Sequence, residues 1–563
     1  MLKNKIIFSW KNINYELVIP IILGIAAFFL ICGSRILNPQ NIAWLANGDP
    51  AQHYLGWVFF RNSEWTFPII GLNPNFGLEI SSSIVFSDSN PLFAILFKLL
   101  SPILPKTFQY FGIWILLCFI LQAIASYKLV ALISNNKIVN NLATLLFLFS
   151  PPFLLRLHGH FNLVGHFTIL FALYFVFSKN LKKYYWILLL NIAILTHFYL
   201  FVMAFVLFIF DLFNKCFIHN KVSVKIISIY TFITLILLLT IAYIIGYFTD
   251  NVNVSDVGFG VFKTNVLSII DSGTVSALST QWSYIIKDIP VPAGSDFEGF
   301  NFLGSGILFI IIVSTILIIN NYNDIFLKIK QYKWLILLCL TIFMFALSNS
   351  IAIATYEFNY YLHSSVLKFA NILRASGRFF WVIFYIIIFS FLYILINYTN
   401  KKTILIILSL AVIIQILDTS IGWMQIRKKL MIKSKDYWVT RLNNSFWADI
   451  PKHYTKLRHI PLINYTKNWS TLSYYSANNN LKTDAVYLAR AQGKNFFKAV
   501  KSTEQVIQNG SFATDSIYIL DDENYDKALK FRENNKNITK YHLYTKIDGF
   551  NVIAPNWFLY KKY

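Results

Sequence analysis

The 563 residues are 56% hydrophobic and only 13% charged, and the mean hydropathy is +0.55. A water-soluble domain of this length needs more charge on its surface, so these values predict a protein that uses a lipid bilayer as part of its solvent. The formal net charge of +23 comes mainly from lysines in short loops between apolar runs, which membrane topology explains. Nucleic acid is therefore not an expected partner.

Apolar runs long enough to cross about 30 Å of hydrocarbon as helices recur along the first three quarters of the chain. Single spans are predicted near residues 17–37, 108–133, 141–157, 163–178, 224–247, 303–320, 334–349, 378–397 and 402–423. The stretch 184–213 is long for one span and short for two. Thr196-His197 interrupts it at a point where a tight hairpin could turn.

The lysines decide how 184–213 is interpreted, because positive residues gather in short cytoplasmic loops. With two helices in this stretch, every lysine cluster between the spans lies on the cytoplasmic side. A single helix would move three of these clusters outside. We therefore predict about eleven spans and a cytoplasmic N-terminus whose first span is retained.

This topology places three sizeable loops and the C-terminal tail outside the cytoplasm. We expect a polytopic domain over residues 1–423 and an extracytoplasmic domain over residues 424–563. The outer loops are 38–107, 248–302 and 350–377. Any catalysis is expected on this outer side.

Local patterns predict the structure of the first outer loop and of the tail. In the loop, Ala51–Phe60 and Pro91–Leu100 have apolar residues at helical spacing, which predicts helices in the plane of the membrane interface. The tail mixes helical patterns around 484–507 and 525–534 with β-prone runs, and is expected to form a small α/β or α+β domain. The β-prone runs are Ser516–Leu520, Phe550–Ile553 and Trp557–Tyr560.

The predicted cytoplasmic loops hold most of the lysines of the membrane region but no arginine. In the whole chain, lysine outnumbers arginine 39 to 10. An arginine in such a sequence indicates a need for its planar fork, which binds phosphate or carboxylate through two parallel hydrogen bonds. Arg374 and Arg378 lie four residues apart where a helix enters the membrane, and for them we favour binding of a phosphate or carboxylate over snorkelling. For Arg35 and Arg61, snorkelling to the interface is an equally good explanation.

Two aspartates of the first outer loop are the leading catalytic candidates. Asp49 precedes Pro50, and Asp88 lies three residues before Pro91, so either could simply cap a helix. With His53 nearby, they could instead supply a general base or bind a divalent cation, Mg²⁺ or Mn²⁺. The sequence leaves both interpretations open.

Histidines cluster after Arg156, at His158, His160 and His166, and His197 lies at the predicted hairpin bend. A His-x-His pair with a third imidazole is a possible metal site, but the spacing matches no trusted zinc signature. Hydrogen bonding to a phosphate or polar substrate and simple burial of the imidazole are the other two interpretations. Glu298, just before the span at 303–320, is a candidate for binding a sugar hydroxyl or a metal.

The architecture resembles the C-type (GT-C fold) glycosyltransferases: many spans, an aspartate soon after the first span, helices in the first outer loop and an exported C-terminal domain. Four motifs resemble more closely a bacterial family of polytopic membrane proteins known only as a domain of unknown function. These motifs are Gly48–His53, Phe86–Leu92, Phe108–Trp114 and Arg374–Trp381. The likeness covers most of the chain, but that family supplies no activity.

The glycosyltransferase resemblance implies a polyprenyl-phosphate-linked sugar as donor. It implies that Asp49 is the base, that Asp88 assists it or helps to bind a metal, and that Arg374 and Arg378 neutralise the departing polyprenyl phosphate. Further candidates are Arg156, His158 and His160 for the phosphate and Gln52, His53 and Glu298 for the substrate. Many members of the class have adjacent carboxylates, whereas Asp49 is followed by Pro50, so metal dependence stays open.

We therefore expect a membrane glycosyltransferase in the bacterial cytoplasmic (inner) membrane that transfers a sugar to a lipid, glycan or cell-envelope acceptor on the outer side. A transporter or flippase of lipid-linked glycans is the alternative. It should place charged residues near the bilayer midplane, where the predicted spans have almost none. A non-catalytic envelope assembly factor is the third hypothesis.

Overall fold

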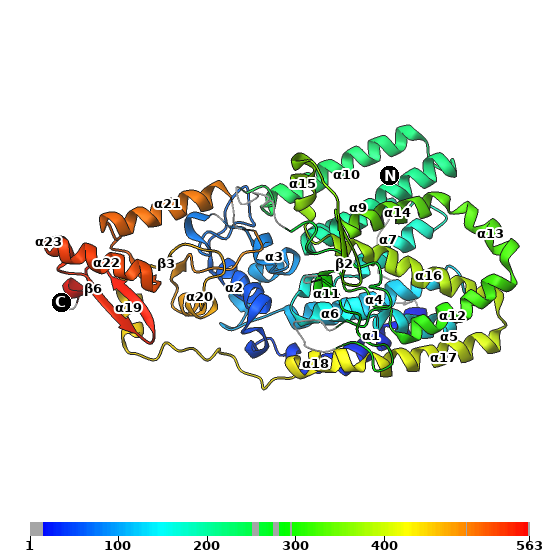
Figure 1. Cartoon of the computed structure of the whole chain (residues 1–563), viewed down its shortest axis with the longest axis horizontal. Helices are drawn as coiled ribbons and strands as arrows, with labels where there is room; N and C mark the ends of the chain where they lie inside the picture. Colours follow the sequence, from blue (N-terminus) through cyan, green and yellow to red (C-terminus); the bar gives the residue numbers. More distant parts are fainter. Residues whose placement is uncertain are drawn as a thin grey trace, which may run out of the picture.

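The computed structural model describes residues 15–80, 82–249, 258–273, 281–292, 295–490 and 493–560. The molecule is elongated, with a helical bundle at one end and a smaller mixed α/β part at the other (Figure 1). Helices α2 (Gly48–Asn62) and α3 (Pro91–Leu99) lie between these two parts. The predicted cytoplasmic N-terminal residues before Tyr15 lie outside the described residues.

Each predicted span contains at least one helix. Helices form because a long apolar segment in lipid can satisfy its backbone polar groups only within itself. The bundle helices are α1 (Val18–Ile31), α4 (Phe111–Val130), α5 (Lys137–Leu148), α6 (Pro151–Leu155), α7 (Phe167–Phe177), α8 (Lys183–Thr196), α9 (Phe198–Phe213), α10 (Val224–Ile244), α12 (Ser305–Asn320), α13 (Tyr322–Gln331), α14 (Lys333–Leu347), α16 (Phe380–Tyr398), α17 (Lys401–Asp418) and α18 (Ser420–Leu430).

The chain is a multi-pass membrane protein. Among the described residues, four helices are long and apolar enough to cross a bilayer, or up to seven if each of three bent helix pairs is one span. Four shorter apolar helices, including α1 and α14, fall below the required length. The number of eleven spans therefore stays a prediction.

The stretch 184–213 forms two antiparallel helices, α8 and α9, as the lysine distribution predicts. Trp186, near the start of α8, donates from Nε1 to Oδ2 of Asp211, near the end of α9, at 2.8 Å. His197 separates the two helices, and its Nδ1 accepts a hydrogen bond of 3.1 Å from the amide of Tyr199. This imidazole therefore caps α9 at the hairpin bend.

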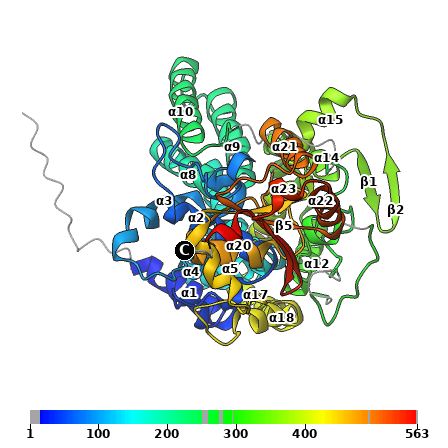
Figure 2. The same cartoon turned by 90° about the vertical axis from the view of Figure 1, so that its left-hand side faces the viewer.

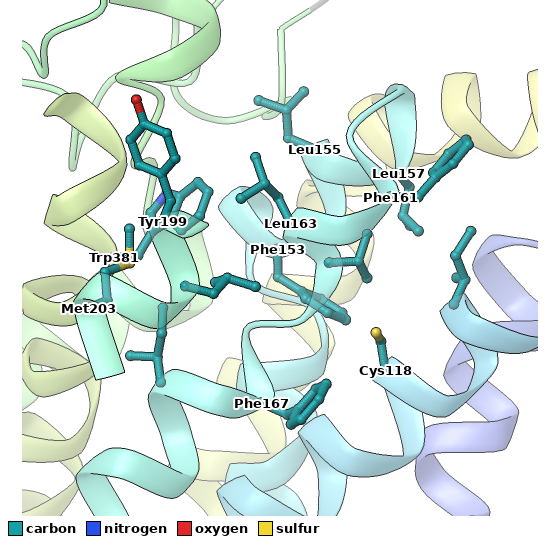
Figure 3. Close-up of a cluster of buried hydrophobic side chains, with 14 of the residues drawn as sticks. Cys118, Phe153, Leu155, Leu157, Phe161, Leu163, Phe167, Tyr199, Met203 and Trp381 are labelled. Atoms are coloured by element: carbon teal, nitrogen blue, oxygen red, sulfur yellow. The ribbon is translucent and has the colours of Figure 1, made fainter. Parts of the chain in front are cut away.

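An apolar cluster joins the helices at the centre of the bundle (Figure 3). It includes Phe153, Phe167 and Met203, from α6, α7 and α9, and Trp381 from α16. The ring of Trp381 is fully buried and lies 5.1 Å from the guanidinium carbon of Arg156. The apolar core thus extends to a charged group and restricts its position.

Both predicted helices of the first outer loop are present, and their place in the membrane interface stays a prediction. Side chains around the whole of α2 are buried, including Gln52 and Trp57. The reason is that α3 and α20 (Trp469–Asn478) both pack against it. Helix α3 keeps an exposed apolar edge at Leu96 and Leu99.

The other outer loops contain short elements at the same end of the bundle as α2. They are α11 (Ser295–Glu298), β1 (Ser350–Ile353), β2 (Tyr356–Asn359) and α15 (Ser364–Ala370), and β1 pairs antiparallel with β2. Seen from the tail end, the β1–β2 hairpin lies at the periphery of the molecule (Figure 2).

The tail forms a mixed five-stranded sheet in the order β4-β3-β5-β7-β6. Strand β3 runs parallel to β4 and β5, whereas β7 runs antiparallel to β5 and β6. The strands are β3 (Lys456–Ile460), β4 (Lys482–Thr483), β5 (Ser516–Leu520), β6 (Leu543–Ile547) and β7 (Phe550–Ala554). The other tail helices are α19 (Phe446–His453), α21 (Lys494–Asn509), α22 (Asp522–Asn534), α23 (Lys536–Thr539) and α24 (Trp557–Tyr560).

The predicted strands at 516–520 and 550–553 are confirmed, and the predicted strand Trp557–Tyr560 is wrong. This segment is the helical turn α24. Strand β7 already pairs with a strand on each side, so no sheet edge is free next to it. Asn556 (φ +60°) turns the chain, and its carbonyl accepts a hydrogen bond of 2.9 Å from the amide of Leu559.

The tail is bonded directly to the first outer loop. The amide of Thr483 donates to the carbonyl of Asn75 at 3.1 Å, and the amide of Gly77 donates to the carbonyl of Thr483 at 2.8 Å. Arg458 of β3 forms an ion pair of 2.6 Å with Glu79. These bonds hold the tail against the end of the bundle at which α2 begins.

Asp418, at the end of α17, ties the second outer loop to the bundle. Its carboxylate accepts hydrogen bonds from the hydroxyls of Ser283 and Ser305 and from the amides of Tyr284 and Ile285. We expect Asp418→Ala to lower the free energy of unfolding by about 3 kcal/mol, because it leaves several buried donors unpaired. Thermal unfolding in detergent measures the loss. The exposed Asp526→Ala variant should match the wild type, and an unchanged Asp418→Ala would contradict this assignment.

Candidate functional site

A cavity of about 750 Å³ lies where the bundle, the outer loops and the tail meet. Its walls come from α2, the loop before α3, the α8–α9 bend, α11, the segment 372–378 and the tail segment 487–490. Most of the site residues predicted from the sequence line it: Asp49, Gln52, Asp88, His160, Glu298, Arg374 and Arg378. The cavity therefore brings together residues that are far apart in the sequence.

Three predicted site residues do not line the cavity, because other groups of the protein bind them. Arg156 is fully buried behind Glu298. The two ring nitrogens of His53 lie 3.3 Å and 2.8 Å from the carbonyl oxygens of Ser87 and Gly159. Nε2 of His158 lies 2.6 Å from Nζ of Lys429. The structure therefore gives these three side chains structural contacts in place of the predicted substrate contacts.

Glu298 is the centre of a buried charge cluster. Its carboxylate accepts two hydrogen bonds from Arg378, one of them 2.6 Å from Nε, and a third of 2.9 Å from Nη1 of Arg156. Burial alone would raise the pKa of Glu298, but the two guanidiniums outweigh it and hold the pKa well below its usual range. Both oxygens are thus engaged, and Glu298 fixes two arginines rather than offering a free carboxylate to a sugar.

The two arginines of this cluster are also held by aromatic rings. The guanidinium carbon of Arg156 lies 5.2 Å from the ring of Phe297, and that of Arg378 lies 4.7 Å from the ring of Tyr199. The fork edge of Arg378 is used by Glu298, so its predicted role as a two-pronged phosphate ligand does not fit this arrangement. Arg378 still lines the cavity, so its positive charge adds to the electrostatic potential there.

Asp49 lies in the first turn of α2 with its side chain in the cavity wall. Its Oδ2 is 3.5 Å from Nδ1 of His160, and the phenol of Tyr487 lies close enough to interact electrostatically with the carboxylate. Burial, followed by the charge of Asp49, raises the pKa of Tyr487. The N-cap of α2 is Asn47, and no side chain forms a capping hydrogen bond there. A carboxylate beside an imidazole and a cavity can accept a proton.

Asp88 faces the same cavity from the loop before α3. The predicted cap of that helix is supplied instead by Asn90, whose Oδ1 accepts from the amide of Phe93 at 3.3 Å. Asp88 (φ +50°) and Asn90 (φ +51°) both have left-handed backbone conformations. Burial raises the pKa of Asp88 despite the opposing charges of His53 and Arg378.

His197 contributes to the site although the sequence indicated only its place at the bend. Its Nδ1 accepts a backbone hydrogen bond, so the proton of the neutral ring lies on Nε2, which is 3.8 Å from Oδ1 of Asp88.

Sequence reasoning also missed Tyr487 and Arg490, which reach the cavity from the tail. Nothing in the local sequence around these two residues marks them as part of a membrane-facing site.

The donor groups do not form a metal cluster. Among the described residues, no three His, Cys, Asp or Glu side chains converge in the way that a metal ion requires. Asp49 and Asp88 share the cavity, and each has an imidazole nitrogen nearby, 3.5 Å away in His160 and 3.8 Å away in His197 respectively. A divalent cation held by these two carboxylates therefore stays a prediction that the geometry does not support.

Comparison with known proteins identifies the family. The model of DUF6311, a domain of unknown function, matches residues 21–420, and the model of the DUF6311 C-terminal domain matches residues 446–555. The chain belongs to the DUF6311 family. This confirms the family resemblance found in the sequence motifs. No curated protein matches the DUF6311 chain.

One solved structure similar to the DUF6311 chain is the crystal structure of the Archaeoglobus fulgidus oligosaccharyltransferase in complex with Zn and sulfate. The TM-score is 0.40 and the identity is 14%, and the match covers 96% of this chain and 73% of that chain. Similarity at this level transfers no residue role and no activity.

We expect Glu298→Gln to lower the free energy of unfolding by about 3 kcal/mol, because the neutral amide leaves Arg156 and Arg378 buried without their counter-charge. Thermal unfolding in detergent measures this change. Glu64→Gln, an exposed substitution in the first outer loop, is the matched control. A Glu298→Gln protein as stable as the control would contradict the role given to this carboxylate.

Proposed function

We propose that this DUF6311 protein is a membrane glycosyltransferase that moves a sugar from a polyprenyl-phosphate-linked donor to a lipid, glycan or cell-envelope acceptor. One observation carries the proposal: two carboxylates, Asp49 and Asp88, share a cavity with the guanidiniums of Arg374, Arg378 and Arg490. Inverting glycosyl transfer needs a base for the acceptor hydroxyl and positive charge for the leaving phosphate. The cavity contains both.

In this proposal Asp49 is the base. Its carboxylate accepts the proton of the acceptor hydroxyl while the acceptor oxygen forms a bond to the anomeric carbon of the sugar. The bond from that carbon to the phosphate oxygen breaks, and its electron pair leaves with the polyprenyl phosphate. Burial lowers the pKa of His160 to about 4, so its ring is neutral at pH 7 and orients Asp49 without neutralising it.

We propose that the cavity opens on the outer side of the bacterial cytoplasmic membrane. Helix α13, which carries Lys328 and Lys330, lies at the end of the bundle opposite the tail (Figure 1). Lysine-rich ends of short loops are typical of the cytoplasmic side. This distribution supports an extracytoplasmic C-terminal domain and a donor that is used after it has reached the outer leaflet.

The direct test is transfer by the purified protein in lipid nanodiscs from a panel of radiolabelled polyprenyl-phosphate sugars. We expect the wild type to release labelled product and Asp49→Asn to lower kcat by about 10²–10⁴-fold, because the amide cannot accept the proton. Asp436→Asn, an exposed change in the tail segment before α19, is the control. If sugar crosses proteoliposome membranes without cleavage of its phosphate bond, the protein is a transporter instead.

A second prediction concerns metal dependence. We expect transfer in excess EDTA to stay within about two-fold of the untreated rate, because the described residues do not gather the ligands that a divalent cation needs. The measurement is the same transfer assay, with Mg²⁺ or Mn²⁺ added back. Loss of activity in EDTA with full recovery on Mn²⁺ would instead support the cation site at Asp49 and Asp88.

A further inference from the structure

The arginines around the cavity fall into two groups that differ in their counter-charges. Arg156 and Arg378 share the carboxylate of Glu298, which accepts hydrogen bonds from both. Arg374 and Arg490 also line or face the cavity, and among the described residues neither has a carboxylate within ion-pair distance. Two guanidiniums of this second group are therefore available to an anion that enters the cavity.

Arg374 and Arg490 are held close together across the boundary between the bundle and the tail. Nη2 of Arg374 lies 3.5 Å from the carbonyl oxygen of Ala489, the residue before Arg490. Nη2 of Arg490 donates to the carbonyl oxygens of Asn371 and Ile372, at 3.2 Å and 2.7 Å. Each guanidinium is thus bonded to the backbone segment that carries the other.

The backbone on both sides of this arginine pair is fixed. On the bundle side, the amide of Phe259 donates to Oδ1 of Asn371 at 2.8 Å, and the side chain of Arg374 packs directly on Gly258. A Cβ atom on Gly258 would lie only 2.8 Å from the Cβ atom of Arg374, so the close approach requires a glycine. On the tail side, the amide of Ala489 donates to the carbonyl of Phe86 at 2.7 Å.

The positive charges of Arg374 and Arg490 repel each other. Burial lowers the pKa of Arg490, and the positive charge of Arg374 acts in the same direction. The carbonyl groups that bind the two side chains are neutral and do not remove the repulsion. An anion placed between the guanidiniums would remove it, and phosphate oxygens match the geometry of the guanidinium fork.

We propose that Arg374 and Arg490 form a phosphate-binding site shared by the bundle and the C-terminal domain. Its ligand is the phosphate of the lipid-linked donor and of the polyprenyl phosphate that remains after transfer. The inference rests on the proposed function for the identity of the ligand. It assigns the phosphate to a different arginine pair from the one that the sequence predicts, since Arg378 fixes Glu298.

A consequence is that the C-terminal domain takes part in donor binding. Its segment 487–490 supplies Arg490 to the phosphate and Tyr487 to the catalytic carboxylate Asp49. The arginine pair and the proposed base therefore line one cavity that this short tail segment also lines. A sugar bound through its phosphate at the arginine pair would extend toward Asp49.

The experiment measures binding without transfer, using the full-length protein in nanodiscs and no acceptor. The probes are farnesyl phosphate, farnesol and inorganic phosphate, and the readout is isothermal titration calorimetry. We expect farnesyl phosphate to bind the wild type at least about tenfold more tightly than farnesol, since only the phosphate pairs with the guanidiniums. Binding of inorganic phosphate with the same arginine dependence would show that the site recognises the headgroup alone.

Arg374→Gln and Arg490→Gln should each weaken farnesyl phosphate binding by about tenfold or more and leave farnesol binding unchanged. Because both arginines contact one phosphate, the double variant should lose less affinity than the two single losses combined. Arg441→Gln, an exposed arginine of the same domain, is the matched control and should bind as the wild type does.

Arg490→Gln also removes two hydrogen bonds to the bundle, so its thermal unfolding without ligand is compared with that of Arg490→Lys. The lysine variant keeps the charge and loses the fork, and it should recover part of the phosphate affinity. The inference is overturned if Arg490→Gln binds farnesyl phosphate like the wild type, or if farnesol binding falls equally. Phosphate binding that depends on both arginines, combined with full transfer by Asp49→Asn, would leave this site intact and reject the proposed catalytic base.

Discussion

The buried pairing of Glu298 with Arg156 and Arg378 is the constraint on which the rest of the site depends. It joins three segments that meet only in the folded chain: the end of α6, the second outer loop and the start of α16. Two guanidiniums and a carboxylate can be buried together only when each satisfies the others, so the three segments have a single arrangement. This cluster therefore fixes the shape of the cavity wall next to Glu298.

Because of this cluster, the charged residues of the cavity have different roles. Glu298 takes the fork of Arg378 and one bond from Arg156, so in the proposed site Arg374 and Arg490 are the arginines that bind the incoming anion. Asp49 and Asp88 lie on the α2 side of the same cavity, each facing one imidazole. The tail completes this arrangement. Arg490 donates to the carbonyl of Ile372 and the amide of Ala489 donates to the carbonyl of Phe86, and these two bonds hold the tail against the cavity.

Composition and periodicity predict the helices well, because an apolar segment in a bilayer has no alternative to internal hydrogen bonds. They also place Asp49, Asp88 and Arg374 on the side where the cavity forms. The partners of these residues are less predictable. Neither the pairing of Arg378 with Glu298, 80 residues away, nor the approach of Arg490 from the tail has any local signal in the sequence. Long-range packing decides both.

The most direct measurement is a cryo-electron microscopy map of the protein in nanodiscs with a short-chain polyprenyl-phosphate sugar bound. We expect density for the phosphate between Arg374 and Arg490, with the sugar ring directed toward Asp49. Density for the headgroup outside the cavity, or a phosphate separated from Asp49 by packed protein, would contradict it.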